Sequence, residues 1–123
     1  METIKPSQNS PIGIFDSGLG GLTVLKSLET ILPNESFIYF GDTAHVPYGT
    51  KSAETVIRYS QHIMDFFQKH ETKAVVIACN TASAVAFQHL QQLYNIPLFD
   101  VVTPSVEFAI NHTKNKNIGV VGT

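Results

Sequence analysis

Hydrophobic residues along the chain alternate between short continuous runs and runs spaced like one face of a helix. Continuous runs too short for helices predict buried strands at residues 11–15, 37–40, 75–79, 97–102 and 117–123. Between them, apolar side chains recur three and four residues apart, which predicts amphipathic helices. The alternation of strand and helix therefore predicts an α/β fold, a doubly wound parallel sheet with helices on both faces.

The predicted helices carry their own start and stop signals. Pro33 disfavours helical geometry at the residue before it and ends the first helix. Ser52 is the expected N-cap of the second helix, and Thr103 caps the last one with Pro104 in its first turn. The stripes expected to face the sheet are Leu22, Leu25, Leu28 and Leu32 in the first helix, and Val56, Ile57, Ser60, Ile63, Met64 and Phe67 in the second.

Composition and charge are those of a globular domain and argue against several other classes of protein. The 123 residues are 43% hydrophobic and 15% charged, with a formal net charge of -2, as in ordinary globular domains. No cluster of Lys and Arg indicates a nucleic-acid partner, and the longest apolar run, residues 74–79, is far too short to cross a membrane. With one cysteine there is no disulfide within the chain, and the five histidines show no metal-ligand spacing. We therefore expect a cytoplasmic protein without a metal site.

The single cysteine lies where open α/β sheets bind ligands. Cys79 ends a predicted strand, and Asn80 and Thr81 behind it are candidate caps of the next helix. A helix start favours the thiolate form of cysteine, which is the nucleophile or base. The plainer interpretation is that Cys79 is a small buried hydrophobic residue, as free cysteines often are.

Two loops are expected at the same edge of the sheet. The sequence Asp-Ser-Gly-Leu-Gly-Gly at 16–21 is either a tight turn, with glycines at positive φ and Asp16 or Ser17 capping the helix, or a loop whose N–H groups hold an anion. Its spacing does not match the usual nucleotide-binding motifs. The loop at 45–49 is long and aromatic, and its Tyr48 either packs on the surface or helps to hold a carboxylate.

Three stretches in this order carry a family resemblance: residues 12–24, 39–52 and 78–84. Together they resemble glutamate racemase, in the aspartate/glutamate racemase family, from about residue 11 to residue 123. The third stretch is shared with aspartate and related racemases, whereas the first two favour glutamate. The resemblance implies a flavodoxin-like sheet of the aspartate/glutamate racemase type.

The resemblance also implies a cofactor-independent racemase in which two cysteines work on opposite faces of glutamate. Cys79 matches the base on the D-glutamate face, and Asp16 matches an acid that assists it. Implied substrate contacts are Asp16, Ser17, Pro47, Tyr48, Gly49, Asn80, Thr81 and Thr123. The product, D-glutamate, would supply peptidoglycan synthesis, and a homodimer is one assembly that the resemblance allows.

The sequence departs from the family pattern in one important respect. The second cysteine, in a Cys-Thr-His motif of the family, is absent from these 123 residues. The resemblance therefore implies a truncated arrangement: a flexible leader at 1–10, an incomplete first α/β domain at 11–102 and the start of a second domain at 103–123. We expect such a fragment to be inactive alone. His45 also stands where many members have arginine.

Two alternatives stay open. A related racemase could act on aspartate instead of glutamate. In a different class, the chain is a flavodoxin-like module whose loops bind an anion and whose cysteine is structural.

Overall fold

The computed structural model describes residues 6–122 and contains a sheet of four parallel strands. Its strands are β1 (Ile12–Asp16), β2 (Phe37–Gly41), β3 (Ala74–Ile77) and β4 (Leu98–Asp100), arranged in the order β2-β1-β3-β4. The chain passes through a helix between each strand and the next one in sequence. The predicted doubly wound α/β fold with a parallel sheet is therefore confirmed.

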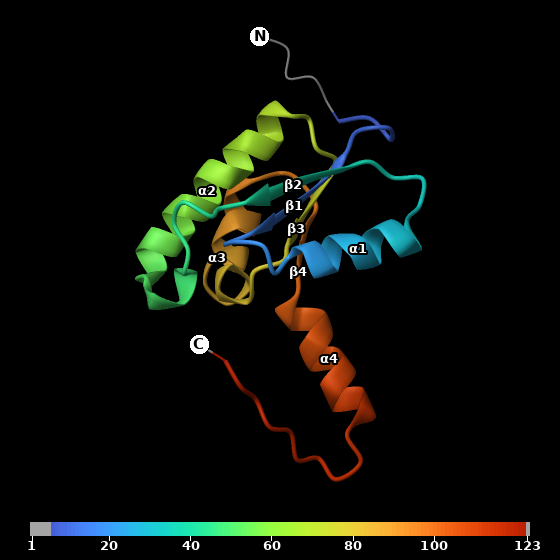
Figure 1. The fold of residues 1–123 in the computed structure, drawn as a ribbon, viewed down its shortest axis with the longest axis vertical. Coiled ribbons are helices and arrows are strands. Elements are labelled where there is room, and N and C mark those ends of the chain that lie inside the picture. The colour runs from blue at the N-terminus through green and yellow to red at the C-terminus, as the bar shows by residue number, and fades with distance from the viewer. Residues whose placement is uncertain (1–5, 123) are drawn as a thin grey trace.

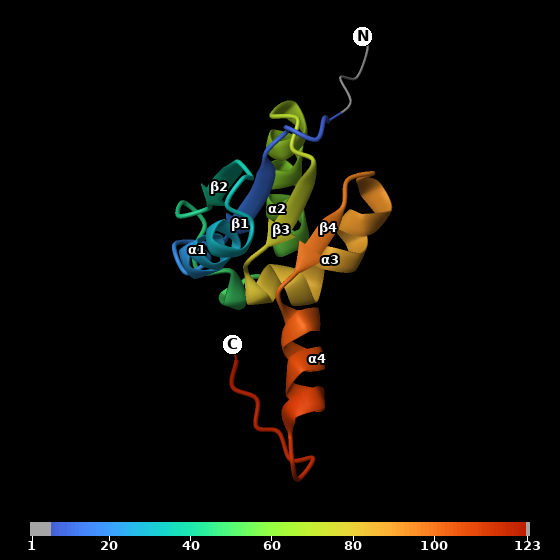
Figure 2. The ribbon, with the colours of Figure 1, turned by 90° about the vertical axis from the view of Figure 1, so that its right-hand side faces the viewer.

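Helices cover the sheet unequally. Figures 1 and 2 show α1 (Leu22–Ile31) on one face of the sheet, and α2 (Ala53–Lys69) and α3 (Asn80–Leu93) on the other. In both views α4 (Val102–His112) projects away from the sheet. The main core lies under α2 and α3 and includes Phe15, Val56, Ile63, Met64, Phe67, Val75, Ile77, Ala82, Ala86 and Leu90.

Gly13 of β1 permits the close approach of α2 to the sheet. A Cβ atom at this position would lie 2.7 Å from Cδ1 of Phe67, which is fully buried. The ring of Phe67 also packs edge-on against Phe40 of β2 and Phe66 of α2. Glycine therefore leaves the space that this aromatic cluster fills.

The apolar stripe of α1 is less buried than its pattern predicts. The helix forms as expected, but none of its residues is buried, and Leu22 is 43% and Leu32 37% exposed. Among the described residues, α1 is the helix that lies on this face of the sheet, since α4 points away from it (Figure 2). Its apolar side chains therefore have neighbours on one side only.

The helix starts confirm one predicted cap and correct another. Ser52 caps α2, because its Oγ accepts the backbone N–H of Thr55 at 3.3 Å. The prediction that Thr103 caps the last helix is wrong. Asp100 instead accepts the backbone N–H groups of Val102 and Thr103 through Oδ2, at 2.9 and 2.8 Å. The helix therefore starts at Val102, and the preceding strand ends earlier than predicted.

The predicted strand at 117–123 is wrong for the residues that the structure describes. Residues 117–122 form neither strand nor helix, and Val120 and Val121 are 89% and 101% exposed. A strand needs the backbone of a neighbouring strand, and no strand of residues 6–122 pairs with this segment. Its apolar run alone therefore does not make it a strand.

Candidate active site

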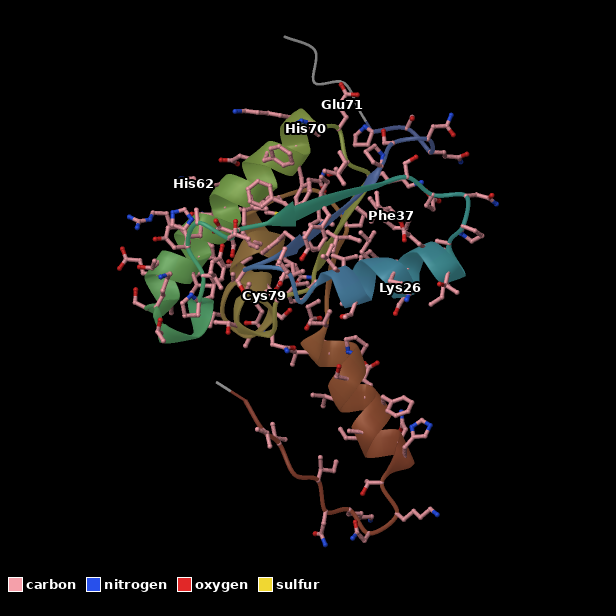
Figure 3. The ribbon with its side chains drawn as sticks, in the orientation of Figure 1. Lys26, Phe37, His62, His70, Glu71 and Cys79 are labelled. Carbon is pink, nitrogen blue, oxygen red and sulfur yellow. The ribbon has the colours of Figure 1, made fainter. Side chains whose placement is uncertain are left out.

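Three polar side chains lie at the carboxyl edge of the sheet. Asp16 ends β1, Asp42 follows β2, and Cys79 follows β3. The parallel register aligns these strand ends: Asp16 pairs with Gly41, and the N–H of Asp42 donates to the carbonyl of Asp16 at 2.9 Å. In Figure 3, Cys79 lies where this edge meets the start of α3. The candidate catalytic side chains thus lie at the edge on which open α/β sheets bind ligands.

Cys79 is itself the N-cap of α3. Its Sγ accepts the backbone N–H of Ala82 at 3.4 Å, and the side chain is 5% exposed. Asn80 and Thr81, the predicted caps, are instead the first residues of the helix. Ser83 fixes the helix to the strand before it, because its Oγ donates to the carbonyl of Ile77 at 3.1 Å. The sulfur therefore lies at the positive end of a helix, where negative charge is stabilised.

Asp16 orders the glycine-rich turn that follows β1. Its Oδ2 accepts the N–H groups of Gly18 and Gly21 at 3.2 and 3.1 Å, and the residue is 8% exposed. The helix cap is Gly21, so neither Asp16 nor Ser17 caps α1 as one interpretation of the turn predicts. No described glycine has a positive φ either.

The glycines of this turn provide space rather than unusual backbone angles. A Cβ atom at Gly21 would lie 2.7 Å from Cβ of Asp16 and 3.0 Å from Cβ of Ala78. Ala78 precedes Cys79, and its N–H donates to the carbonyl of Phe15 at 2.8 Å. The turn with Asp16 is therefore packed directly beside the strand end that leads to the thiol.

Asp42 holds Tyr48 in the site, and sequence reasoning did not select it. The Tyr48 hydroxyl donates to Oδ2 of Asp42 at 2.5 Å, and these residues are 1% and 8% exposed. Burial, followed by the Asp42 carboxylate and the charges of Cys79 and Tyr59, raises the pKa of Tyr48 well above its usual range. The phenol therefore stays a donor and lies within electrostatic reach of the thiol. The position of Asp42 just after a predicted strand is the one sequence feature that indicates it as a candidate site residue.

The loop after β2 is also held against α2. Nδ1 of His45 lies 2.8 Å from Oδ1 of Asp42, and its ring stacks on Tyr59 of α2 with centroids 4.1 Å apart. Tyr48 begins a short 3-10 turn, η1 (Tyr48–Thr50). Tyr48 thus does not pack on the surface, whereas Pro47 and Gly49 beside it are exposed.

The structure brings most of the predicted site residues to one edge of the sheet. Two strand ends and the η1 turn contribute the buried Asp16, Cys79 and Tyr48. Less buried positions follow them in the chain or flank them: Ser17, Pro47, Gly49, Asn80 and Thr81. Thr123 lies outside the described residues. Their roles toward a substrate stay predictions.

Other kinds of site have little support in the described part of the chain. Within it, no group of three His, Cys, Asp or Glu side chains could hold a metal ion. Nor does any described helix have the length and apolar character to cross a membrane. Two surface hollows lie elsewhere, one around Lys73 and Glu35 and the other around Phe99 and Pro104.

A family model described as Asp/Glu/Hydantoin racemase matches residues 12–123. The chain belongs to this racemase family. It is 55% identical over 112 residues to a glutamate racemase of Geobacter metallireducens, an alignment covering 91% of this chain and 42% of the relative. The similarity therefore extends over nearly the whole of this chain.

Solved structures of the racemase family share the fold. The glutamate racemase of Aquifex pyrophilus aligns with a TM-score of 0.90 at 48% identity, covering 92% of this chain and 45% of that one. The Francisella tularensis enzyme, solved in complex with D-glutamate, aligns with a TM-score of 0.79 at 50% identity, covering 84% of this chain and 40% of that one. The chain spans less than half the length of the relatives it matches.

Proposed function

We propose that the chain supplies the Cys79 half of a glutamate racemase active site. The observation that carries this proposal is the position of the thiol, which caps α3 at the sheet edge where Asp16 and Tyr48 also lie. Family membership and the glutamate racemases among the relatives support the same activity. A relative solved with D-glutamate supports this amino acid as the substrate class.

The proposed reaction is proton transfer at the α-carbon. The Cys79 thiolate removes the α-proton of D-glutamate, so that the Cα–H bond breaks, an S–H bond forms and the electron pair stays on carbon. Fixed donors stabilise the carbanion charge, and a second acid on the opposite face returns a proton to give L-glutamate. The chain has one cysteine, so it supplies one of these two groups.

The residues around Cys79 have separate roles in this proposal. Asp16 assists the thiol and fixes the turn that presents Ser17. Tyr48 remains a protonated donor because burial and Asp42 raise its pKa. The other substrate contacts that we propose are Pro47, Gly49, Asn80, Thr81 and Thr123. The backbone N–H groups of Asn80 and Thr81, at the start of α3, suit a carboxylate.

The cellular role follows from the product. We place the protein in the cytoplasm, where D-glutamate would enter peptidoglycan synthesis. A homodimer is the assembly that we propose for the intact protein, with neither nucleic acid nor membrane as a partner.

Substitution of Cys79 in the intact protein tests this function. Cys79→Ala removes both the base and the helix cap, whereas Cys79→Ser keeps an oxygen acceptor for the Ala82 N–H and removes the thiol. We expect both variants to lose glutamate racemisation, followed by circular dichroism, and Cys79→Ser to keep the wild-type thermal midpoint. Full activity in either variant would refute a catalytic thiol.

The same assay separates the alternative functions. Comparing glutamate with aspartate distinguishes the two racemase activities, and faster turnover of aspartate would overturn the substrate assignment. A flavodoxin-like anion-binding module would instead bind its ligand equally well with and without the Cys79 thiol and would show no turnover.

A further inference from the structure

Tyr39 connects β2 to the turn that carries Asp16 and Ser17. Its hydroxyl donates to the carbonyl of Gly18 at 2.9 Å, which joins residues 21 positions apart in the sequence. Tyr39 pairs in register with Ile14 of β1, two residues before Asp16. The phenol therefore reaches from the neighbouring strand to the turn at the carboxyl edge of the sheet.

Glycines leave room for this contact on both sides. A Cβ atom at Gly41 would lie 2.5 Å from the Gly18 carbonyl oxygen and 3.2 Å from Cε1 of Tyr39. A Cβ atom at Gly21 would lie 3.0 Å from the Tyr39 hydroxyl oxygen. A larger residue at Gly41 or Gly21 would displace the turn or the phenol of Tyr39. Glycine at both positions therefore leaves room for the hydrogen bond between Tyr39 and Gly18.

The backbone of Gly18 is held on both sides of its Cα atom. Its N–H donates to Oδ2 of Asp16 at 3.2 Å, and its carbonyl accepts from Tyr39. Burial, and next the negative charge of Asp16, raise the pKa of Tyr39, whereas the backbone N–H of Gly21 lowers it. The hydroxyl is thus a donor at neutral pH and lies within electrostatic reach of the Asp16 carboxylate.

We propose that Tyr39 is a positioning residue for proton transfer at Cys79, acting through the Gly18 carbonyl to fix Ser17 and the Asp16 carboxylate. This inference rests on the proposed racemase function. Asp16 uses Oδ2 to hold the turn, and within residues 6–122 its Oδ1 accepts no hydrogen bond. A carboxylate that assists a thiol must be held in place, because an error of about 1 Å can cost about 100-fold in rate.

Tyr39→Phe in the intact protein tests the proposal, with Tyr94→Phe as the matched control. Tyr94 also donates its hydroxyl, to the Gln61 carbonyl at 3.1 Å and to Asp65 at 2.7 Å, but it lies at the opposite end of α3 from Cys79. We expect Tyr39→Phe to lower kcat by about 10-fold or more, with a smaller change in KM. Tyr94→Phe should keep the wild-type kcat below its thermal midpoint.

Isotope effects separate positioning from a general loss of structure. If the step at Cys79 becomes slower, the primary isotope effect with α-deuterated D-glutamate rises in Tyr39→Phe, and that with α-deuterated L-glutamate does not. Gly41→Ala, which pushes on the Gly18 carbonyl and keeps the Tyr39 hydroxyl, should show the same asymmetry.

The outcomes distinguish a failure of the positioning role of Tyr39 from a failure of the proposed racemase mechanism. Wild-type kcat and isotope effects in Tyr39→Phe, together with an inactive Cys79→Ser, would overturn the positioning role alone. An active Cys79→Ser would overturn the racemase mechanism and the positioning role with it. Equal losses of kcat in Tyr39→Phe and Tyr94→Phe would also overturn the positioning role.

Discussion

Removing the hydroxyl of Tyr48 should destabilise the fold by a predictable amount. Tyr48 is 1% exposed and donates at 2.5 Å to Asp42, which is 8% exposed. A hydrogen bond to a charged group contributes about 1.5–3 kcal/mol, and Tyr48→Phe leaves the carboxylate with His45 as its remaining side-chain partner. We therefore expect the free energy of unfolding at pH 7 to fall by about 2 kcal/mol, measured by chemical denaturation.

The matched control is Tyr59→Phe. Tyr59 stacks on His45 and lies near Tyr48, but its hydroxyl forms no hydrogen bond within the described residues. The same chemical change there should alter the free energy of unfolding by about 0.5 kcal/mol or less. Equal losses in the two variants would refute the assignment of the effect to the Asp42 hydrogen bond.

The pH dependence gives a second, independent test of Tyr48. Its pKa is raised in the folded state, so the folded protein keeps the phenolic proton at pH values where the unfolded chain, with a tyrosine pKa of about 10, has lost it. The stabilisation is therefore complete below pH 10 and falls above it by about 1.4 kcal/mol per pH unit. Tyr48→Phe should reduce this alkaline slope, and an unchanged slope between pH 10 and 11.5 would contradict the raised pKa.

Two further predictions concern the core and the single thiol. Ser60 is fully buried and its hydroxyl has no hydrogen-bond partner in the described structure, so Ser60→Ala should leave the free energy of unfolding unchanged or raise it by up to about 1 kcal/mol. The control Ser83→Ala, which loses the hydrogen bond to Ile77, should lower it by about 1 kcal/mol, and a similar loss in Ser60→Ala would contradict the prediction. The isolated 123-residue chain should not interconvert D- and L-glutamate, since it supplies one cysteine, and any circular dichroism change under these conditions would refute the requirement for a second acid.

The elements that sequence predicts best are those whose pattern and packing agree. The helix after Ser52 combines a clear period with a buried face and forms as predicted. The 37–40 run also forms its predicted strand, which pairs with β1 although its residues are only partly buried. The segment at 117–122 also carries apolar residues, at Ile118, Val120 and Val121, but pairs with no strand in the described residues. A pattern reports which residues could be buried, whereas a strand also depends on a partner elsewhere in the chain.

The sequence predicts which loops lie together at the candidate site, but it does not predict the individual hydrogen bonds between them. Strand ends of a parallel sheet share one edge, which is why Asp16, Tyr48 and Cys79 could be grouped from sequence. Asp42 was not selected because its importance comes from burial together with a tyrosine hydroxyl six residues away. Tyr39 is harder still, since its partner lies on another loop and is a backbone carbonyl, which no side-chain motif reveals.

Backbone groups fix the positions of Cys79 and Asp16 in the candidate site. The Ala82 N–H holds the sulfur of Cys79, and the Gly18 and Gly21 N–H groups hold one oxygen of Asp16. Such contacts depend on the main chain of the strand-to-helix turns, so we expect them to form together with the sheet. The proposed racemisation needs another group, because inverting a carbon centre requires a proton from the opposite face. In the proposed mechanism, this half of the site can therefore be structurally preorganised while inversion still depends on a second acid.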